Sequence, residues 1–228
     1  MSARNEVSPS SPAEERARAQ ERLSAPLAEL LAAFGGRGVE ATRDRLLGWL
    51  AAVALWNRKL DLTAARDDRE LVDLMVADAA LLAGELPAGV SVVDVGTGAG
   101  APGLALALLR PDLRVTLVEP RNKRAAFLRT VLGSLATAQD GGMQLAADVE
   151  QARVEQLGPS DFDVALSRAT LAPAAWLEQG ARLAPRGEVW VLLAREPAPE
   201  LAGWRLEREV RYRWPLTGAE RRAVSYRP

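Results

Sequence analysis

The residues best suited to chemistry lie in one glycine-rich loop, within the stretch VVDVGTGAGAPGLAL. Asp94 ends an apolar run that we expect to be a buried strand. Three glycines follow it at alternate positions: Gly96, Gly98 and Gly100. Glycine adopts backbone conformations closed to other residues and lets a ligand lie against bare backbone. A second acid, Glu119, ends the next apolar run, so the pattern predicts a nucleotide-like ligand held between two strand ends.

Two ligands are compatible with this loop. Gly96, Gly98 and Ala101 match the GxGxxG/A fingerprint of dinucleotide sites. Asp94 favours S-adenosyl-L-methionine, because a strand-end carboxylate can hold the ammonium of a methionine moiety but would repel a pyrophosphate. The chain also lacks histidine and any Tyr-x-x-x-Lys pair suited to hydride transfer. We therefore expect S-adenosyl-L-methionine as cofactor, with Glu119 accepting hydrogen bonds from the ribose hydroxyls. The expected cofactor-binding residues of this region are Asp94, Gly96, Thr97, Gly98, Gly100, Ala101 and Glu119.

The composition excludes several kinds of chemistry. The 228 residues contain no cysteine and no histidine, so disulfides, thiol nucleophiles and the commonest general base and metal ligand are all absent. We expect no metal site. No apolar run approaches the length of a membrane span, and the N-terminus has no secretory core segment, so we expect a cytoplasmic protein without membrane contact.

Local charge is uneven although the net charge is only −1. Residues 121–129 carry four basic side chains and no acid, and residues 201–228 carry seven arginines against three glutamates. A net charge near zero does not indicate a nucleic-acid binder. The two segments are either ordinary solvated faces or local contacts with a polyanion.

The order of expected elements defines an α/β fold. We expect residues 1–25 to be disordered or frayed, 26–86 to form a helical N-terminal extension with helices near 26–34, 39–58 and 68–82, and 87–228 to form the catalytic domain. From residue 90 strands and helices alternate with short links, which predicts a parallel sheet covered on both faces. Residues 204–214 alternate with period two and a turn follows, which predicts a final antiparallel hairpin. A parallel sheet that ends in such a hairpin is typical of Rossmann-like class I S-adenosylmethionine-dependent methyltransferases, and we expect this fold.

The missing residue types also limit the methyl acceptor. Without cysteine the chain cannot form the thiolate adduct used to methylate pyrimidine carbons, and no Asn/Asp-Pro-Pro-aromatic tetrapeptide for exocyclic amines occurs. An acceptor that already carries a lone pair, such as a purine ring nitrogen, needs alignment rather than a strong base. Arginines would position a phosphate backbone.

Several motifs carry a resemblance to a known family. WNRKLDLTAARDDREL precedes the glycine loop, KRAAFLR follows the second strand, and FDVALSRA spans the fourth. Together they resemble the 16S ribosomal RNA guanine-N7 methyltransferase family, first named glucose-inhibited division protein B, over residues 40–228. The resemblance implies methyl transfer to a guanine N7 in 16S ribosomal RNA, with the small ribosomal subunit as partner. We expect the chain to act as a monomer.

The resemblance also assigns residues. Gly96 and Ala101 match cofactor contacts, and Arg168 matches an arginine at the cofactor and active site. Arg221 matches a C-terminal basic residue at the RNA or active site. An arginine of the family precedes a Val-Glu pair whose backbone meets adenine, which places Arg153, Val154 and Glu155 at the cofactor and Arg153 among the catalytic candidates. The strand pattern alone would favour 148–150 for the adenine contact.

The chain departs from the family at two places. The basic residue and the histidine expected before Asp78 are Leu74 and Met75, and the lysine expected at the end of the fifth strand is Leu193, with Arg195 the nearest basic group. A catalytically degenerate cofactor-binding relative and a methyltransferase for a non-RNA acceptor therefore remain alternatives. Asp78 itself lies on an apolar helical stripe, where we expect a buried carboxylate satisfied by backbone donors or an arginine.

Overall fold

A computed structural model describes residues 11–35, 40–136, 145–168, 171–194, 196–200 and 202–227, without the side chains of residues 40 and 41. Seven strands form one sheet in the order β3-β2-β1-β4-β5-β7-β6. Five neighbouring strands are parallel, and β7 runs antiparallel between β5 and β6. The strands are β1 (Ser91–Val95), β2 (Arg114–Val118), β3 (Ala147–Glu150), β4 (Val164–Arg168), β5 (Glu188–Leu193), β6 (Arg205–Arg213) and β7 (Glu220–Arg227). The predicted parallel sheet with a closing antiparallel hairpin is confirmed.

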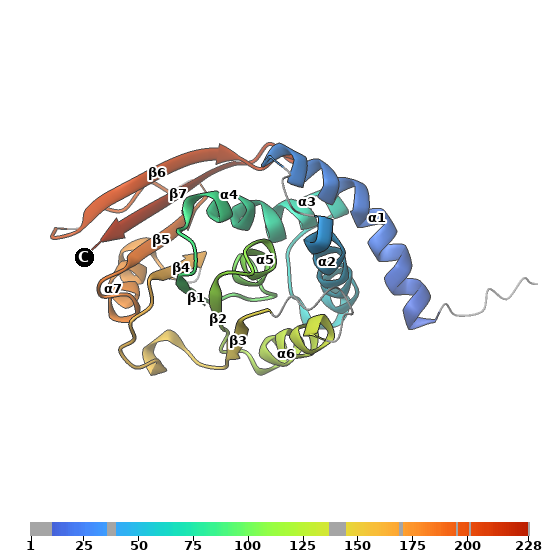
Figure 1. Cartoon of the computed structure of the whole chain (residues 1–228), viewed down its shortest axis with the longest axis horizontal. Helices are drawn as coiled ribbons and strands as arrows, with labels where there is room; N and C mark the ends of the chain where they lie inside the picture. Colours follow the sequence, from blue (N-terminus) through green and yellow to red (C-terminus); the bar gives the residue numbers. More distant parts are fainter. Residues whose placement is uncertain are drawn as a thin grey trace, which may run out of the picture.

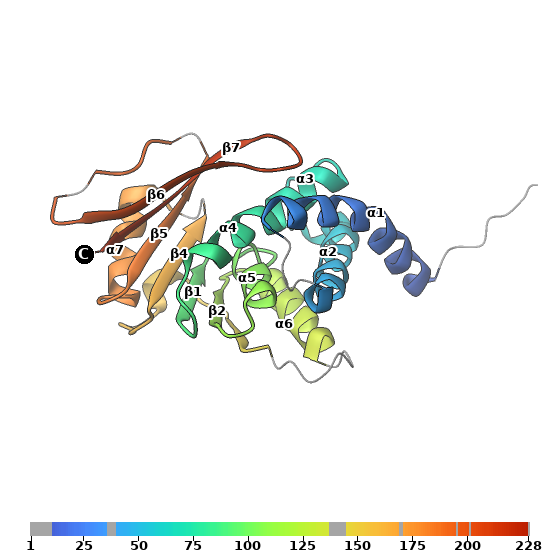
Figure 2. The same ribbon diagram turned by 45° about the horizontal axis from the view of Figure 1, so that its top comes forward.

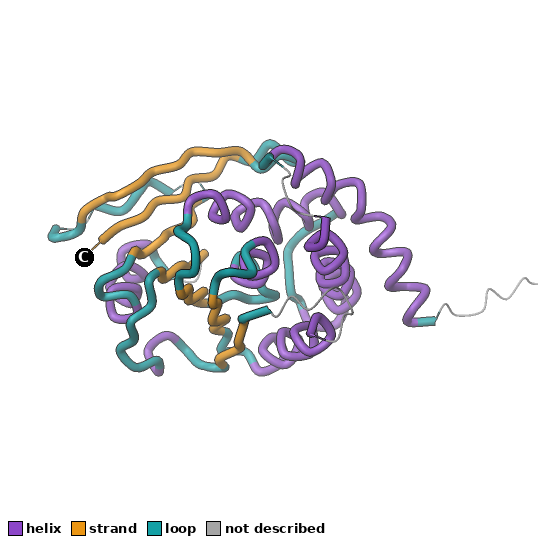
Figure 3. Tube along the Cα trace, viewed as in Figure 1, coloured by secondary structure: helices purple, strands orange, loops and turns teal. Residues whose placement is uncertain are grey.

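Helices cover both faces of the sheet (Figures 1 and 3). Alternate strand residues point to opposite faces, so the buried apolar side chains separate into two clusters. The larger cluster joins one face to helices α1 to α6, and the smaller joins the other face to α7. The helices are α1 (Pro12–Ala33), α2 (Glu40–Leu60), α3 (Asp68–Val72), α4 (Asp78–Glu85), α5 (Gly103–Leu109), α6 (Asn122–Ala136) and α7 (Pro173–Leu183). No helix in the described ranges is long and apolar enough to cross a membrane.

The start of α1 differs from the prediction of a frayed segment followed by a helix at Pro26. α1 is continuous from Pro12, because Ser11 and Glu14 form a reciprocal capping box and proline suits the first helical turn. The helix continues through Pro26 because Leu23 and Leu27, on either side of it, are fully buried. Residues 1–10 lie outside the described chain, and the proposed boundary at residue 86 stays a prediction.

The helix predicted at 68–82 contains a π-helical turn, η1 (Asp73–Ala77), between α3 and α4. Residues five apart share a face across a π turn, whereas residues four apart do so in an α-helix. Arg69, Asp73 and Asp78 therefore point the same way, towards the β6–β7 hairpin. The Leu216 carbonyl accepts from Arg69, and the Leu216 N–H donates to Asp73. Figure 2 shows the hairpin reaching from the sheet to these helices.

The packing of α7 on the sheet yields a test. A Cβ added to Gly180 would overlap the γ-carbons of Val189 in β5, whereas one added to Gly133 in α6 meets nothing within 4 Å. We expect Gly180→Ala to lower the free energy of unfolding by about 1–3 kcal/mol through overpacking. Gly133→Ala, the matched control, should raise it by about 0.5–1 kcal/mol through helix propensity. Urea unfolding measures both, and equal effects would contradict the close approach of α7.

Candidate active site

The glycine-rich loop between β1 and α5 is fixed from two sides. The N–H groups of Gly96 and Thr97 donate to the Val118 carbonyl at the end of β2, at 2.8 and 3.1 Å. The indole of Trp49, on α2, donates to the Ala99 carbonyl at 3.0 Å. Gly96 has a φ of 76°, in the left-handed region where a side chain is costly. The loop is thus held in one conformation with its backbone bare.

Asp94 lies at the carboxyl end of β1 and is 1% exposed. Its Oδ2 accepts a hydrogen bond of 2.8 Å from the N–H of Gly103, at the start of α5. Its Oδ1 and the Thr97 hydroxyl have no partner among the described residues. Burial raises the pKa of Asp94 to about 6, and the neighbouring Thr97 side chain, followed by the Gly103 N–H, offsets part of this rise. A buried carboxylate oxygen without a partner is a position for a cation or a donor from a ligand.

Glu119 follows β2 and faces the same loop. Its Oε2 accepts from the Gly98 N–H at 3.1 Å and its Oε1 from the Arg121 N–H at 2.8 Å. The side chain is 3% exposed, so the carboxylate sits against the loop rather than in solvent. The structure therefore brings both strand-end acids to the glycine loop, as predicted.

The loop opens where the strand order reverses, between β1 and β4. In open α/β sheets this point lies beneath the ligand-binding crevice. The Ser167 hydroxyl, near the end of β4, donates to the Val95 carbonyl at 2.9 Å and ties the two strand ends together. Arg168, the last residue of β4, follows directly.

One candidate adenine segment lies on β3, which pairs with β2, and the other follows β3 in the chain. Asp148 and Glu150 are exposed on β3, and the Glu119 N–H donates to the Glu150 carbonyl at 3.1 Å. Val154 begins a 3₁₀ turn, η2 (Val154–Gln156), and belongs to the buried cluster that contains the β1 and β2 ends. Arg153 and Glu155 are exposed on either side of Val154. Only the 153–155 segment thus contributes a residue to the core beneath the crevice.

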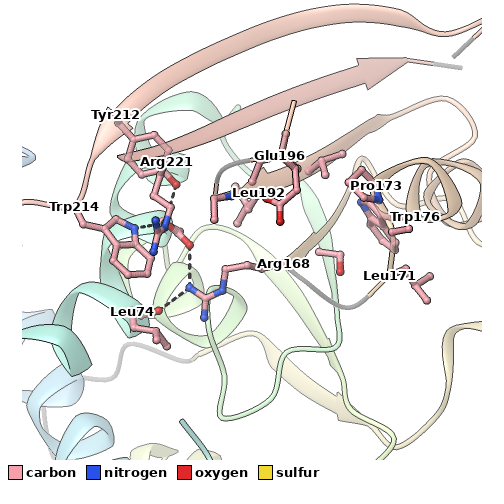
Figure 4. Close-up of a pocket in the computed structure, with 16 residues that line it drawn as sticks. Leu74, Arg168, Leu171, Pro173, Trp176, Leu192, Glu196, Tyr212, Trp214 and Arg221 are labelled. Carbon is pink, nitrogen blue, oxygen red and sulfur yellow. Dashed lines mark hydrogen bonds and ion pairs between the residues drawn. The ribbon is translucent and has the colours of Figure 1, made fainter. Parts of the chain in front are cut away.

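A cavity of about 470 Å³ opens beside the crevice, at the ends of β4 and β5 (Figure 4). Its walls come from η1, β4, α7, β5 and the hairpin. One side is apolar and includes Leu171, Pro173 and Trp176. The opposite side carries Arg168, Arg221, Tyr212 and Asp78, and the acid Glu196 also lines the cavity. The cavity therefore combines an apolar wall, which suits a planar ring, with two cations and two acids, of which Asp78 is paired with Arg168.

Asp78 organises the polar side of this cavity. Its Oδ1 accepts from the Tyr212 hydroxyl and the Trp214 indole, each at 2.7 Å, and its Oδ2 accepts from Arg168 at 2.9 Å. The carboxylate is 2% exposed, and three donors satisfy it. Burial, followed by the charge of Asp78, raises the pKa of Tyr212 far above its usual range, so this phenol remains a donor. The expectation that an arginine satisfies a buried Asp78 is confirmed.

The two cavity arginines are held in different ways. Arg168 Nη1 also donates to the Leu74 carbonyl at 2.6 Å, so the guanidinium is fixed against η1. The Arg221 guanidinium carbon lies 3.7 Å from the centroid of the Trp214 ring, a cation–π contact. Since Asp78 orients that indole, a single carboxylate positions both cations (Figure 4). Arg153 does not line this cavity.

The departures from the family pattern fall in or near the cavity. Leu74 and Leu193 line it, whereas Met75 is buried in the core behind. Arg195 lies outside the described residues. At positions 74 and 193 the resemblance implied basic side chains, and both are leucines that form part of the cavity wall. Arg168 and Arg221 supply the positive charge of the described lining.

Sequence reasoning missed four residues that build the site: Trp49, Asp73, Tyr212 and Trp214. Tyr212 and Trp214 lie on one face of the first strand of the predicted hairpin, so the period-two pattern already showed that they share a side. The pattern did not show that their shared partner is Asp78, 134 and 136 residues earlier in the chain. From the sequence, Trp49 is expected to be an ordinary core residue of its helix. Helical periodicity does not reveal that its indole donates to the Ala99 carbonyl.

The fold and the site together define a Rossmann-like methyltransferase of class I. Rv0187 from MTB, solved with its cofactor bound, superposes with a TM-score of 0.54 at 19% identity, over 80% of this chain and 88% of that one. At that identity the likeness concerns the fold alone.

Sequence comparison identifies the family. The model of the rRNA small subunit methyltransferase G family matches residues 43–212, and the chain belongs to that family. Ribosomal RNA small subunit methyltransferase G of Halorhodospira halophila is 42% identical over 161 residues, 70% of this chain and 73% of that protein. Its counterpart from Chromohalobacter salexigens is 40% identical over 79% of this chain and 82% of that protein. The predicted family is confirmed.

The hydrogen-bonding role of Asp78 can be measured. In Asp78→Asn one carboxylate oxygen becomes an NH₂ donor, which must face either Arg168 or the Tyr212–Trp214 pair. We expect the free energy of unfolding to fall by about 2–3 kcal/mol, the cost of losing charged hydrogen bonds in a buried site. Urea unfolding measures the loss, and intrinsic fluorescence should report a changed Trp214 environment. Asp73→Asn changes a buried acid at the start of the π turn that accepts from Leu216 and Thr217 and not from Trp214, so it is the control for the fluorescence change. A loss below about 0.5 kcal/mol for Asp78→Asn would contradict the role.

Proposed function

We propose that the protein transfers a methyl group from S-adenosyl-L-methionine to N7 of a guanine in the 16S ribosomal RNA of the small ribosomal subunit. The observation that carries this proposal is the cavity beside the glycine loop, which presents Arg168 and Arg221 and an apolar wall. Guanine N7 already has a lone pair, so a chain without histidine or cysteine can methylate it by alignment alone. Family membership supports the RNA substrate.

The cofactor site that we propose uses both strand-end acids. The unpartnered Asp94 Oδ1 suits the cofactor ammonium, and Thr97 Oγ1 beside it suits a second polar contact. Glu119 would exchange its loop hydrogen bonds for the ribose hydroxyls. The bare backbone that would lie under the cofactor belongs to Gly96, Gly98, Gly100 and Ala101. S-adenosyl-L-methionine, when bound, supplies the electrophilic methyl group.

For adenine we propose Val154 and Glu155 rather than residues 148–150. The burial of Val154 among the residues beneath the crevice supports this choice. Arg168 would lie between cofactor and acceptor, Arg221 would hold the RNA at the cavity, and Arg153 would contact RNA from the rim of η2. We propose that the chain acts as a monomer, without a metal, on small subunits in the cytoplasm.

A second candidate rests on the aliphatic cavity walls. Leu74 and Leu193 remove positive charge from the acceptor side, which would suit a smaller or less anionic acceptor, or a relative that binds cofactor without turnover. The retained Arg168 and Arg221 support the RNA proposal over both.

Labelled methyl transfer tests the proposal directly. We expect small subunits from cells lacking the modification to gain label at guanine N7. Asp94→Ala should reduce kcat/KM by about 10- to 100-fold, the cost of a lost charged hydrogen bond. Asp44→Ala, which removes an exposed acid of α2, is the control. Absence of transfer to subunits, with cofactor binding confirmed by calorimetry, would reject the RNA proposal and favour the second candidate.

The raised pKa of Asp94 predicts a pH dependence. Above about pH 6 the carboxylate is ionised before the cofactor ammonium binds, whereas below it most molecules must first lose a proton. We therefore expect cofactor affinity to weaken by up to about tenfold per pH unit below pH 6. Calorimetric titration of the wild type and of Asp94→Asn distinguishes the ionisation of Asp94 from that of other groups. The amide does not ionise, so the cofactor affinity of Asp94→Asn should be weak and nearly independent of pH. If the cofactor affinity of the wild type does not change between about pH 5 and 8, the assigned contact between Asp94 and the cofactor ammonium is wrong.

A further inference from the structure

The C-terminal end of α2 projects past the glycine loop. The Thr42 hydroxyl donates to the Leu108 carbonyl near the end of α5, and the Trp49 indole donates to Ala99 before α5 begins. Trp56 follows Trp49 by seven residues, on the same helical face and about 10 Å further along the axis. The end of α2 is thus at the carboxyl edge of the sheet, where the cofactor loop lies.

The first turn of α6 lies beside this end of α2 (Figures 1 and 2). The rings of Trp56 and Phe127 have centroids 6.2 Å apart at an angle of 57°. Arg124 Nη2 donates to the Asp61 carbonyl, just after α2, at 2.5 Å. A Cβ on Gly98 would lie 3.9 Å from Arg124 Nη1, so this junction borders the cofactor loop.

Basic side chains lie at the two helix ends that form this junction: Arg58 and Lys59 in the last turn of α2, and Arg121 and Lys123 at the start of α6. Trp56 is 45% exposed, one of two large apolar side chains exposed to this degree among the described residues. We define the α2–α6 platform as Trp56, Arg58, Lys59, Arg121 and Lys123. The four cations are exposed, and none of them forms an ion pair within the described structure. Asp61, just after α2, is an exposed acid next to them, and the first turn of α6 contains no acid.

The chain after α2 holds this end of the helix in place. Asn57 Oδ1 accepts from the N–H groups of Leu62 and Thr63 at 2.7 and 2.9 Å, and its Nδ2 donates to the Thr63 carbonyl at 3.0 Å. The side chain thereby closes the turn back onto the helix. A surface held in this way loses little conformational entropy on binding.

We propose that the α2–α6 platform binds a single-stranded segment of the RNA next to the target nucleotide, with one base stacked on Trp56 and phosphates against the four cations. Unpaired bases stack on exposed aromatic rings whatever their identity, and flanking cations neutralise the backbone. A protein partner would not require exposed, unpaired cations around one ring. The inference rests on the proposed function, because it places the same RNA on a second surface beside the cofactor loop.

The experiment compares matched variants of the full chain. Trp56→Ala is paired with Leu206→Ala, which removes the other large exposed apolar side chain, at 47% exposure on β6. Trp56→Phe retains a stacking ring. Arg58→Ala/Lys59→Ala is paired with Arg114→Ala/Arg186→Ala, which removes two exposed cations near the opposite ends of the parallel strands. The probe is 16S ribosomal RNA transcribed in vitro, titrated at several salt concentrations, and steady-state transfer to unmodified small subunits gives kcat and KM.

Trp56→Ala should weaken RNA binding by about 5- to 150-fold, the range for one lost base stack, and Trp56→Phe by much less. Arg58→Ala/Lys59→Ala should reduce the slope of log K against log salt by about 1.4, for two lost contacts with a single strand. KM should rise with kcat nearly unchanged, and calorimetric cofactor affinity should stay that of the wild type.

Other outcomes overturn the inference in distinguishable ways. If the wild type methylates subunits but Trp56→Ala behaves as Leu206→Ala does, the platform is wrong and the proposed function stands. Lost cofactor binding in Trp56→Ala would show a structural role for the ring. If the wild type neither binds nor methylates ribosomal RNA, the platform and the proposed function fail together.

Discussion

The carboxylate of Asp78 is the interaction on which the rest of the site depends. It joins the N-terminal helices to the end of β4 and to the C-terminal hairpin, through Arg168, Tyr212 and Trp214. The π turn places it there, because the extra residue brings Asp78 onto the face that already carries Asp73. Without this turn the acid would point elsewhere. The polar wall of the cavity, and through Trp214 the position of Arg221, follow from this one group.

Two buried aspartates illustrate how the same side chain serves different purposes. Asp78 has three donors for its two oxygens, so it fixes its neighbours. Asp94 accepts one hydrogen bond, from Gly103, and its other oxygen has no hydrogen-bond partner in the described structure. Its pKa is raised because burial outweighs the opposing effects of Thr97, Gly103 and Arg168. A buried carboxylate oxygen without a hydrogen-bond partner costs stability. Such an oxygen is expected where a bound ligand supplies the missing hydrogen bond. The first aspartate belongs to the architecture of the site, and the second is available to a ligand.

The absence of histidine and cysteine directs the chemistry towards alignment and charge. Family membership, the crevice at the strand-order reversal and the two cavity arginines agree on a methyl acceptor that needs no deprotonation. Because Leu74 and Leu193 are aliphatic, the positive charge of the described cavity lining comes from Arg168 and Arg221. The exposed cations of the proposed α2–α6 platform add positive charge at the border of the glycine loop.

The sequence by itself determined the class of fold, the glycine loop with its two acids, the hairpin and the family, because strand alternation, turn residues and local motifs are properties of neighbouring residues. It misjudged the start of α1, where an apolar face carries the helix through Pro26, and it did not reveal the π turn. Tertiary structure alone decided which distant groups meet: Asp78 with Tyr212, Trp49 with Ala99 and Trp56 with Phe127. These contacts join residues 50 or more positions apart, and the packing of whole helices against the sheet sets them. No spacing rule along the chain encodes that packing.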